Sequence, residues 1–300
     1  MTASATRHFT IVPQGPFSLA EAATFGFGQR NAAPFDGVMR LAFCVDGEGY
    51  SRQAGVAVRQ DADGVVLCEV SGDADLETVR CQVARVLSLD HDAREFLEIG
   101  TRDPVMARLL TLAPGLRPPL FYSPYEAAAW SVLSARRPAR QMALVRTRLS
   151  EAHGTTIEIA GERVAALPTP EQLLGVTGFP GIPEVKLHRL HGVAEAARDG
   201  RLDCDHIRSM DPEDARRELQ QLDGIGPFYS ALIVIRASGH ADVLPDQEPQ
   251  ALELAGRLYA LGGDATPEDM RRLGERWRPF RTWAVVLLRA AGPRLLNEQA

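Results

Sequence analysis

The residues best suited to chemistry in this 300-residue sequence begin with a glycine-rich turn, LDGIGP at positions 222–227. Gly224 and Gly226 permit backbone angles that side chains forbid, so the chain can turn tightly between two helices. Pro227 suits the first position of the next helix, whose free amides and positive dipole end can bind a phosphate. The turn therefore predicts an anion site. The alternative is a tight helix–helix turn that binds nothing.

Three carboxylates follow one helix later, in segment 242–248: Asp242, Asp246 and Glu248. A carboxylate that faces a groove can stabilise positive charge that develops on a reacting group. Cleavage of an N-glycosidic bond creates such charge on the sugar. The segment predicts a charge-stabilising site, and the alternative is a solvated acidic loop whose carboxylates cap helices.

The elements that must position these motifs change in character along the chain. Residues 36–72 mix β-branched and apolar residues between Asp-Gly turn signals, which predicts strands, and a helix is expected over 75–89. After Gly115 the periodicity is almost entirely helical. The expected helices cover 125–135, 141–153, a short one that opens at Thr169-Pro170, 183–199, one that opens at Asp211-Pro212, the stretch from the turn to Ser238, 249–261, and 267–291 with a break near Pro279.

Composition sets limits on the class of protein. The formal net charge of −6 weighs mildly against nucleic-acid binding, yet the arginines are clustered and could form a local basic face. Those clusters could equally be solvated helix faces. No two of the four cysteines form a C-x-x-C pair, which indicates free thiols rather than a metal site or a disulfide framework.

Targeting signals are equally scarce. No apolar run approaches the roughly 18–20 residues that a membrane helix needs, and the first ten residues are polar. We expect a cytoplasmic protein with no membrane partner.

The turn, the helix and the acidic segment together resemble the helix-hairpin-helix (HhH-GPD) DNA glycosylase superfamily. Its hallmark is L-x-G-(I/V)-G-x-x-(T/S)-A followed by D-x-x-P-x-x-D. Asp242, Pro245 and Glu248 fall on the second motif, with glutamate where the family carries its catalytic aspartate. Within the superfamily the sequence is most similar to DNA-3-methyladenine glycosylase II, over most of the chain from Gly115 to the stretch RRLGERWRPFRTWA that starts at Arg271.

The resemblance implies the fold class: α+β, with an N-terminal α+β (TBP-like) domain before a mostly α-helical helix-hairpin-helix core. The expected domains are residues 1–112 and 113–300, the second with two helical subdomains that flank a DNA-binding cleft. The resemblance also implies double-stranded DNA with damaged bases as the partner, and a monomer as the acting species. It requires no cofactor or metal, although hairpin carbonyls in this superfamily often hold a monovalent cation.

Individual residues take roles by the same resemblance. Glu248, or Asp246 if the loop shifts, would be the catalytic carboxylate. Arg136 would enter the DNA where the damaged nucleotide is flipped out; its alternative is a surface arginine that contacts phosphate. The DNA-binding set is Gly224, Ile225, Gly226, Pro227, Phe228, Arg136 and Arg137, and the candidates for the base pocket are Phe228, Tyr229, Trp283 and Arg289.

The implied function is a monofunctional glycosylase that removes alkylated bases, methylated purines above all, in base excision repair. Relatives that also cut the strand carry a lysine two residues after the second hairpin glycine, where this chain has Phe228. The single lysine, Lys186, lies on another expected helix. Two alternatives stay open: a DNA- or lesion-binding protein with weakened or lost catalysis, and a protein-interaction module that reuses the fold.

Overall fold

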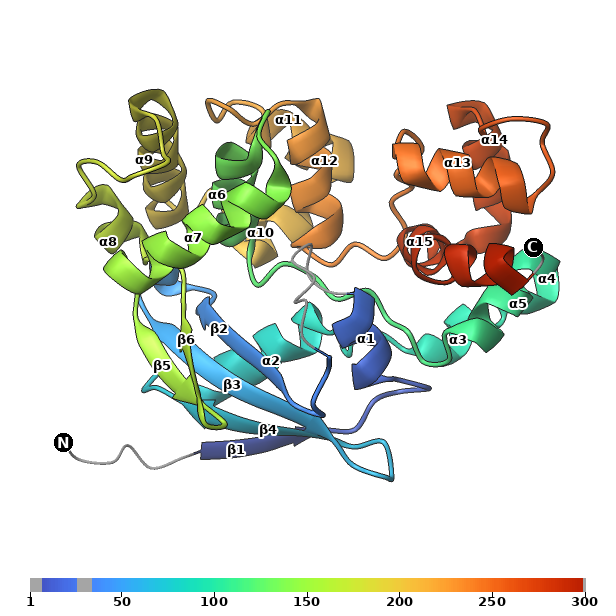
Figure 1. Ribbon diagram of the computed structural model, residues 1–300, viewed down its shortest axis with the longest axis horizontal. Coiled ribbons are helices and arrows are strands. Elements are labelled where there is room, and N and C mark those ends of the chain that lie inside the picture. Colours follow the sequence, from blue (N-terminus) through green and yellow to red (C-terminus); the bar gives the residue numbers. More distant parts are fainter. Residues whose placement is uncertain (1–6, 26–33, 299–300) are drawn as a thin grey trace.

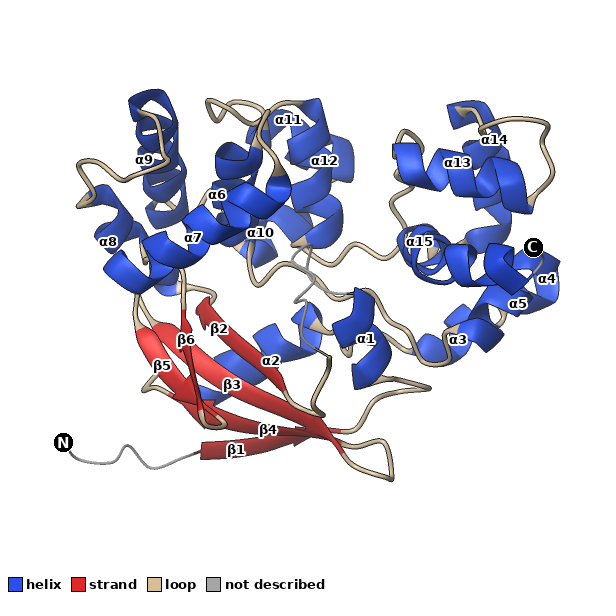
Figure 2. Ribbon diagram, viewed as in Figure 1, coloured by secondary structure: helices blue, strands red, loops and turns tan. Residues whose placement is uncertain are grey.

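The structure, a computed structural model, describes residues 7–25 and 34–298. A strongly curved antiparallel sheet forms the base of the molecule, and two groups of helices stand above it (Figures 1 and 2). The sheet has the strand order β1-β4-β3-β2. Its elements are β1 (Arg7–Ile11), α1 (Leu19–Phe25), β2 (Met39–Cys44), a 3-10 turn (Glu48–Tyr50), β3 (Gln53–Gln60), β4 (Val66–Ser71) and α2 (Leu76–Val86).

Each face of the sheet is covered by a different partner. Alternate residues of β3, among them Val56 and Val58, pack against α2 in one core. The other face receives a β-hairpin from the middle of the chain, made of β5 (Thr156–Ile159) and β6 (Glu162–Ala165). The hairpin packs directly against Gly55 of β3. A Cβ at this position would come within 2.7 Å of the Ile157 side chain, so the close packing requires a glycine.

The first helical group shares one core and carries the glycine-rich turn. Its polar anchor to the sheet is Glu126, which is buried and accepts hydrogen bonds from the Cys44 amide (3.1 Å) and from Arg146 (2.6 Å). Its helices are α6 (Pro124–Ser134), α7 (Ala139–His153), α8 (Pro170–Leu174), α9 (Glu184–Arg198), α10 (Cys204–Ser209), α11 (Pro212–Leu219) and α12 (Pro227–Arg236).

The second helical group combines segments that are distant in the sequence. Phe96, Ile99 and Met106, which precede residue 112, share a core with Leu254 and Trp277 from the C-terminal region. Packing therefore crosses the expected boundary at residue 112, and the division into 1–112 and 113–300 stays a prediction. The helices are α3 (Ala93–Leu97), α4 (Ile99–Arg102), α5 (Pro104–Leu112), α13 (Pro249–Leu258), α14 (Pro267–Gly274), a 3-10 turn (Glu275–Trp277) and α15 (Arg281–Glu298).

A repeated dipeptide begins many of these helices. In each case a capping side chain accepts a hydrogen bond from a backbone amide of the first turn, and a proline at the first positions has no amide to satisfy. In the described chain, the six caps that precede such a proline are Asp103 (α5), Ser123 (α6), Thr169 (α8), Asp211 (α11), Glu248 (α13) and Thr266 (α14).

The predicted fold class is confirmed: an antiparallel sheet lies at the N-terminal end and the rest is mostly helical. Two expectations need correction. The region after Gly115 contains the β5–β6 hairpin, which the sequence did not predict. The predicted break near Pro279 is present between α14 and α15, but α15 runs on to Glu298 and does not end at residue 291.

Candidate functional site

The glycine-rich turn joins α11 to α12 as a compact hairpin. Leu222 and Ile225 are buried in the first helical core, and the Ile225 amide donates to the Leu222 carbonyl at 3.0 Å. Gly224 has φ +91°, a conformation that side chains rarely adopt, and a Cβ there would lie 3.0 Å from the Arg189 side chain. The apolar residues thus fix the hairpin while Gly224 turns the chain.

The start of α12 exposes backbone donors. Gly226 occupies the capping position and provides no side-chain hydrogen bond to the helix. The amides of Gly224, Gly226 and Phe228 donate to no other group within residues 7–25 and 34–298. Free amides at the positive end of a helix dipole form an anion site. The neighbouring Phe228 side chain is 63% exposed, so the site opens to solvent.

Glu248 occupies the start of the next helix, α13. Its Oε2 accepts a hydrogen bond from the Ala251 amide at 2.6 Å and lies 3.5 Å from Arg289 Nε. No hydrogen bond from the described residues reaches Oε1. One carboxylate oxygen is therefore fixed by the helix, and the other is left for a bound molecule.

The other two carboxylates of the acidic segment are held by arginines. Asp242 accepts from Arg281 Nε at 2.8 Å and from Arg278 at 3.1 Å. Asp246 lies 3.5 Å from Arg271 Nε, on α14. The structure thus separates the three acids: Asp242 anchors the segment to α15, Asp246 pairs with α14, and Glu248 caps α13.

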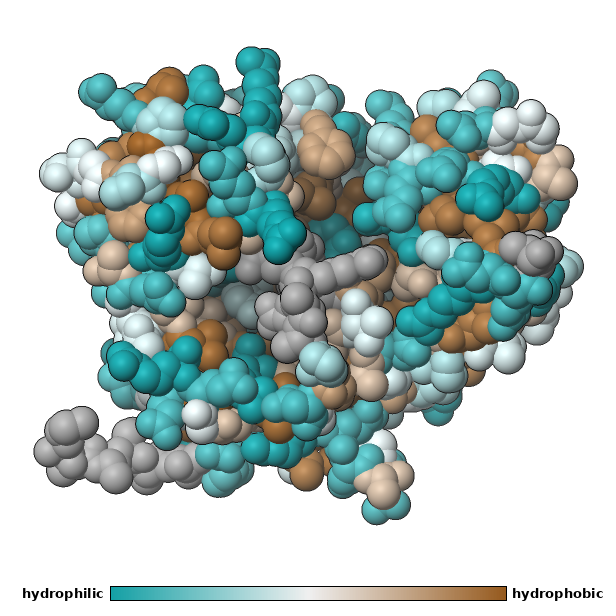
Figure 3. All heavy atoms as spheres, viewed as in Figure 1, coloured by the Kyte–Doolittle hydropathy of each residue, from teal (hydrophilic) through white to brown (hydrophobic). Residues whose placement is uncertain are grey.

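The segment between α12 and α13 is anchored at both ends. Arg85, almost fully buried on α2, donates to the carbonyl of Ala237 at 2.5 Å and to Asp46 at 2.6 Å. At the other end, Thr282 Oγ1 donates to the Val243 carbonyl at 2.6 Å. These bonds fix the end of α12 relative to the start of α13. Figure 3 shows the surface hollowed between the two helical groups, and we call this hollow the groove.

Two arginines and one aromatic ring, which the sequence analysis did not combine, lie together beside Glu248. The guanidinium of Arg236 lies 5.4 Å from the ring centre of Phe25, and that of Arg289 lies 6.0 Å from it. Burial and, second, the nearby Arg289 guanidinium lower the pKa of Arg236 to about 10. Arg289 was a pocket candidate, whereas Phe25 and Arg236 come from distant segments and have no local signal.

The turn between α6 and α7 is held from below by Lys186 of α9. Its Nζ donates to the carbonyls of Leu133 at 2.6 Å and Ala135 at 2.9 Å. Burial, together with the nearby guanidinium of Arg137, lowers the pKa of this lysine. Arg136 projects from the turn, exposed, with a positive φ of 56°. The lysine thus supports an exposed pair of arginines.

The remaining pocket candidates lie in different surroundings. Tyr229 is half-buried, and its hydroxyl lies 3.4 Å from Ser134 Oγ, which links α12 to the α6–α7 turn. Trp283 is only 2% exposed and packs edge-on against Phe96 in the second helical core. Trp283 is therefore a core residue, and its side chain does not face the groove.

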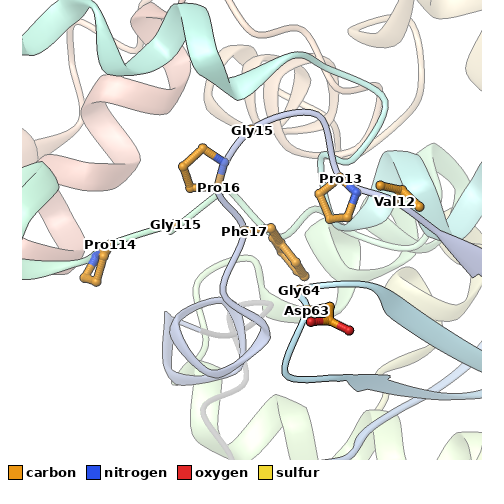
Figure 4. Close-up of a pocket in the computed structure, with 9 residues that line it drawn as sticks. All are labelled: Val12, Pro13, Gly15, Pro16, Phe17, Asp63, Gly64, Pro114 and Gly115. Carbon is orange, nitrogen blue, oxygen red and sulfur yellow. The ribbon is translucent and has the colours of Figure 1, made fainter.

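Other site types find little support. In the described ranges, no cluster of three or more His, Cys, Asp or Glu side chains is arranged to hold a metal ion. No described helix is both long and apolar enough to span a membrane. A pocket beside the sheet, shown in Figure 4, has Asp63 as its one charged lining residue and includes none of the candidate site residues.

Known proteins are similar to this chain in sequence and in fold. No protein-family model matches the chain. The probable bifunctional transcriptional activator/DNA repair enzyme AlkA of Mycobacterium tuberculosis is 28% identical over 214 residues, which are 70% of this chain and 42% of that protein. DNA-3-methyladenine glycosylase 2 of Escherichia coli is 27% identical over 186 residues, 60% of this chain and 62% of that protein. The chain thus spans less than two thirds of either relative.

Similarity in structure extends over nearly the whole chain. The 3-methyladenine DNA-glycosylase from Archaeoglobus fulgidus superposes with a TM-score of 0.76 at 20% identity, covering 96% of this chain and 99% of that one. The chain therefore shares the fold of this DNA glycosylase, with the predicted hairpin in place at the start of α12.

Proposed function

We propose that this protein is a monofunctional DNA glycosylase of base excision repair, which hydrolyses the N-glycosidic bond of alkylated bases, methylated purines among them, flipped out of duplex DNA. One observation carries the proposal. A helix whose uncapped start has open amides is followed by one short, anchored segment, which leads to a second helix start with a fixed carboxylate. The names of the relatives support the same activity.

The open hairpin supplies the grip on DNA. A backbone phosphate would accept hydrogen bonds from the amides of Gly226 and Phe228, and the helix dipole would add to the attraction. The exposed Arg136 and Arg137 project from a turn linked to the same helix through Tyr229. This turn is the element we propose to enter the duplex when a nucleotide is flipped out.

Glu248 supplies the chemistry. As the C1′–N bond breaks, its electron pair leaves with the base and positive charge develops on the sugar ring. The free Oε1 of Glu248 would stabilise that charge and orient a water molecule, whose oxygen bonds to C1′. The proton that this water loses passes to solvent when the departing base was a cation, and to the base when it was neutral. The products are the free base and an abasic site.

Strand cleavage is not part of the proposal. A lyase needs a free amine to form a Schiff base with the sugar. The position after the hairpin carries Phe228, and the amine of Lys186 is engaged by two carbonyls. Incubation with abasic duplex and borohydride should trap no covalent complex. We further propose that the protein acts as a monomer in the bacterial cytosol, which sizing of the DNA complex would test.

The deciding experiment measures free base released from methylated duplex DNA. Glu248→Gln should lower the rate by roughly 100- to 1000-fold, because a charge that faces the transition state is lost. Glu253→Gln is the matched control: it removes an exposed carboxylate from the same helix and should leave the rate unchanged. Thermal unfolding of both variants checks that the cap exchange leaves the fold intact.

Either outcome is informative. Release that Glu248→Gln abolishes and Glu253→Gln preserves would establish the proposed catalyst. DNA binding by the wild type with no release of any base would leave the lesion-binding alternative in its place. Full activity of Glu248→Gln would end the assignment of the carboxylate.

A further inference from the structure

Two arginine side chains lie close to Glu248. Arg289, 30% exposed, lies 3.5 Å from Glu248 Oε2 and donates to the neutral side chain of Gln250 at 3.1 Å. The guanidinium of Arg236 lies 5.4 Å from the ring centre of Phe25, and that of Arg289 lies 6.0 Å from the same ring centre. Two guanidiniums thus accompany one carboxylate.

Arg236 is not neutralised by an acid of its own. Among the described residues its hydrogen-bond partner is the Pro119 carbonyl at 2.6 Å, and its buried Nε has no partner. Coulomb interactions weaken slowly with distance where water is excluded. The charge of Arg236 is therefore felt at Arg289. A molecule bound beside Glu248 would meet two guanidiniums and one carboxylate.

The charge of a modified base decides how it responds to such a surface. A purine nucleotide methylated at N3 or N7 carries a cationic base, which departs as a neutral molecule. A neutral modified base departs with the electron pair of the C1′–N bond and gains negative charge until a proton arrives. A guanidinium repels the first base in the ground state and stabilises the second in the transition state.

We propose that Arg289 is a specificity-determining residue that directs this glycosylase toward neutral modified bases and away from cationic ones. The inference rests on the proposed function and adds to it the charge class of the preferred base. Glu248 would stabilise the positive charge that develops on the sugar. Arg289, with the added charge of Arg236, would stabilise negative charge on the departing base. An aromatic side chain at position 289 would stack on either class without this preference.

The test compares single-lesion duplexes that carry ethenoadenine, a neutral base, or 7-methylguanine, a cationic one. The quantity measured is kcat/KM divided by the spontaneous release rate, since the cationic base also leaves unaided. The wild type should show the larger enhancement for ethenoadenine. Arg289→Gln should lower that enhancement by about 10-fold, the value of one hydrogen bond to a charged group, without lowering that for 7-methylguanine.

Arg257→Gln is the control, because it removes one exposed arginine from the far end of α13. It should leave the ratio of the two enhancements unchanged. Equal losses on both lesions in Arg289→Gln, or a larger wild-type enhancement for 7-methylguanine, would overturn the inference while the glycosylase function stands. Release of neither base by the wild type would overturn both.

Discussion

Helices α12 and α13 follow one another in the chain and both carry a proline at the start, yet only α13 has a side-chain cap. Six helices of the described chain pair such a proline with a capping Ser, Thr, Asp or Glu, and α12 departs from this by using Gly226. A capping side chain contributes about 1 kcal/mol to stability, so its omission needs a reason.

The two hairpin glycines show that the reason is not steric. Gly224 has a positive φ of 91° and its position is crowded by Arg189. Gly226 has φ −92°, and a Cβ there would meet no atom within 4 Å. The fold would therefore accept a side chain at 226, including a cap. The missing cap leaves backbone amides of α12 without a hydrogen-bond partner. At α13, Glu248 accepts a backbone hydrogen bond with Oε2, and its Oε1 accepts none from the described residues.

The sharpest way to break this comparison is to give α12 the cap that the other helices have. In Gly226→Asp the carboxylate would accept from the first-turn amides and would repel an incoming phosphate. We expect duplex affinity, measured by fluorescence anisotropy at low salt, to fall by about 100-fold, since like charges in contact cost several kcal/mol. The free energy of unfolding should stay the same or rise by about 1 kcal/mol.

Gly226→Ala separates the charge from the loss of glycine. Alanine fits the open space at this position and brings neither a charge nor an acceptor. Its duplex affinity should remain within roughly 3-fold of the wild type, the size of effect expected for a neutral surface substitution. If Gly226→Asp bound DNA as well as Gly226→Ala, the α12 amides would not be a phosphate site.

Local signals predicted the hairpin and the helix starts correctly, because glycine and proline act on the residues beside them. The β5–β6 hairpin escaped prediction since its turn, Ala160-Gly161, lacks the Asn-Gly or Asp-Gly signature. Its stability depends on contact with Gly55, about a hundred residues earlier in the sequence. The predicted fold class did not need this element, and a derivation from periodicity could not supply it.

In the candidate site, too, local features were predictable from the sequence and contacts between distant segments were not. The N-cap position of Glu248 followed from its place before Pro249, a local feature. That Trp283 is a core residue while Arg289, farther along the same helix, reaches Glu248 depends on which face of α15 meets α13. The contact of both Arg236 and Arg289 with Phe25 joins three segments, and no spacing in the sequence encodes it.

The C-terminal end of α6, which is capped by a side chain of α9, provides a second test with a smaller expected effect. The last carbonyls of α6 receive the amine of Lys186, so this terminus is satisfied by protein, like the start of α13 and unlike that of α12. Lys186→Met keeps the length of the side chain and removes its donors. The free energy of unfolding, measured with urea, should fall by about 2 kcal/mol because buried carbonyls lose their partner.

The same variant should weaken binding to abasic duplex more than binding to intact duplex, because the α6–α7 turn is the element proposed to enter the gap. Lys186→Arg retains a charged donor and should recover part of both losses. A variant that lost stability but bound both duplexes in the wild-type ratio would show that Lys186 supports the core and has no part in positioning the turn.

The smallest effect concerns the segment that sets the spacing of α12 and α13. Burial, followed by the charge of Arg208, lowers the pKa of His240, whose Nε2 is buried without a hydrogen-bond partner in the described chain. The unfolded chain takes up the proton near pH 6.5, and the folded protein does so only at lower pH. Stability should therefore fall as pH drops below about 6.5, by at most about 1.4 kcal/mol per pH unit. His240→Asn should flatten this dependence of stability on pH, measured by urea unfolding between pH 7 and pH 5.5. An unchanged slope would mean that His240 has the same pKa in the folded and unfolded states. The segment joining the capped and uncapped helices would then contain no buried proton acceptor.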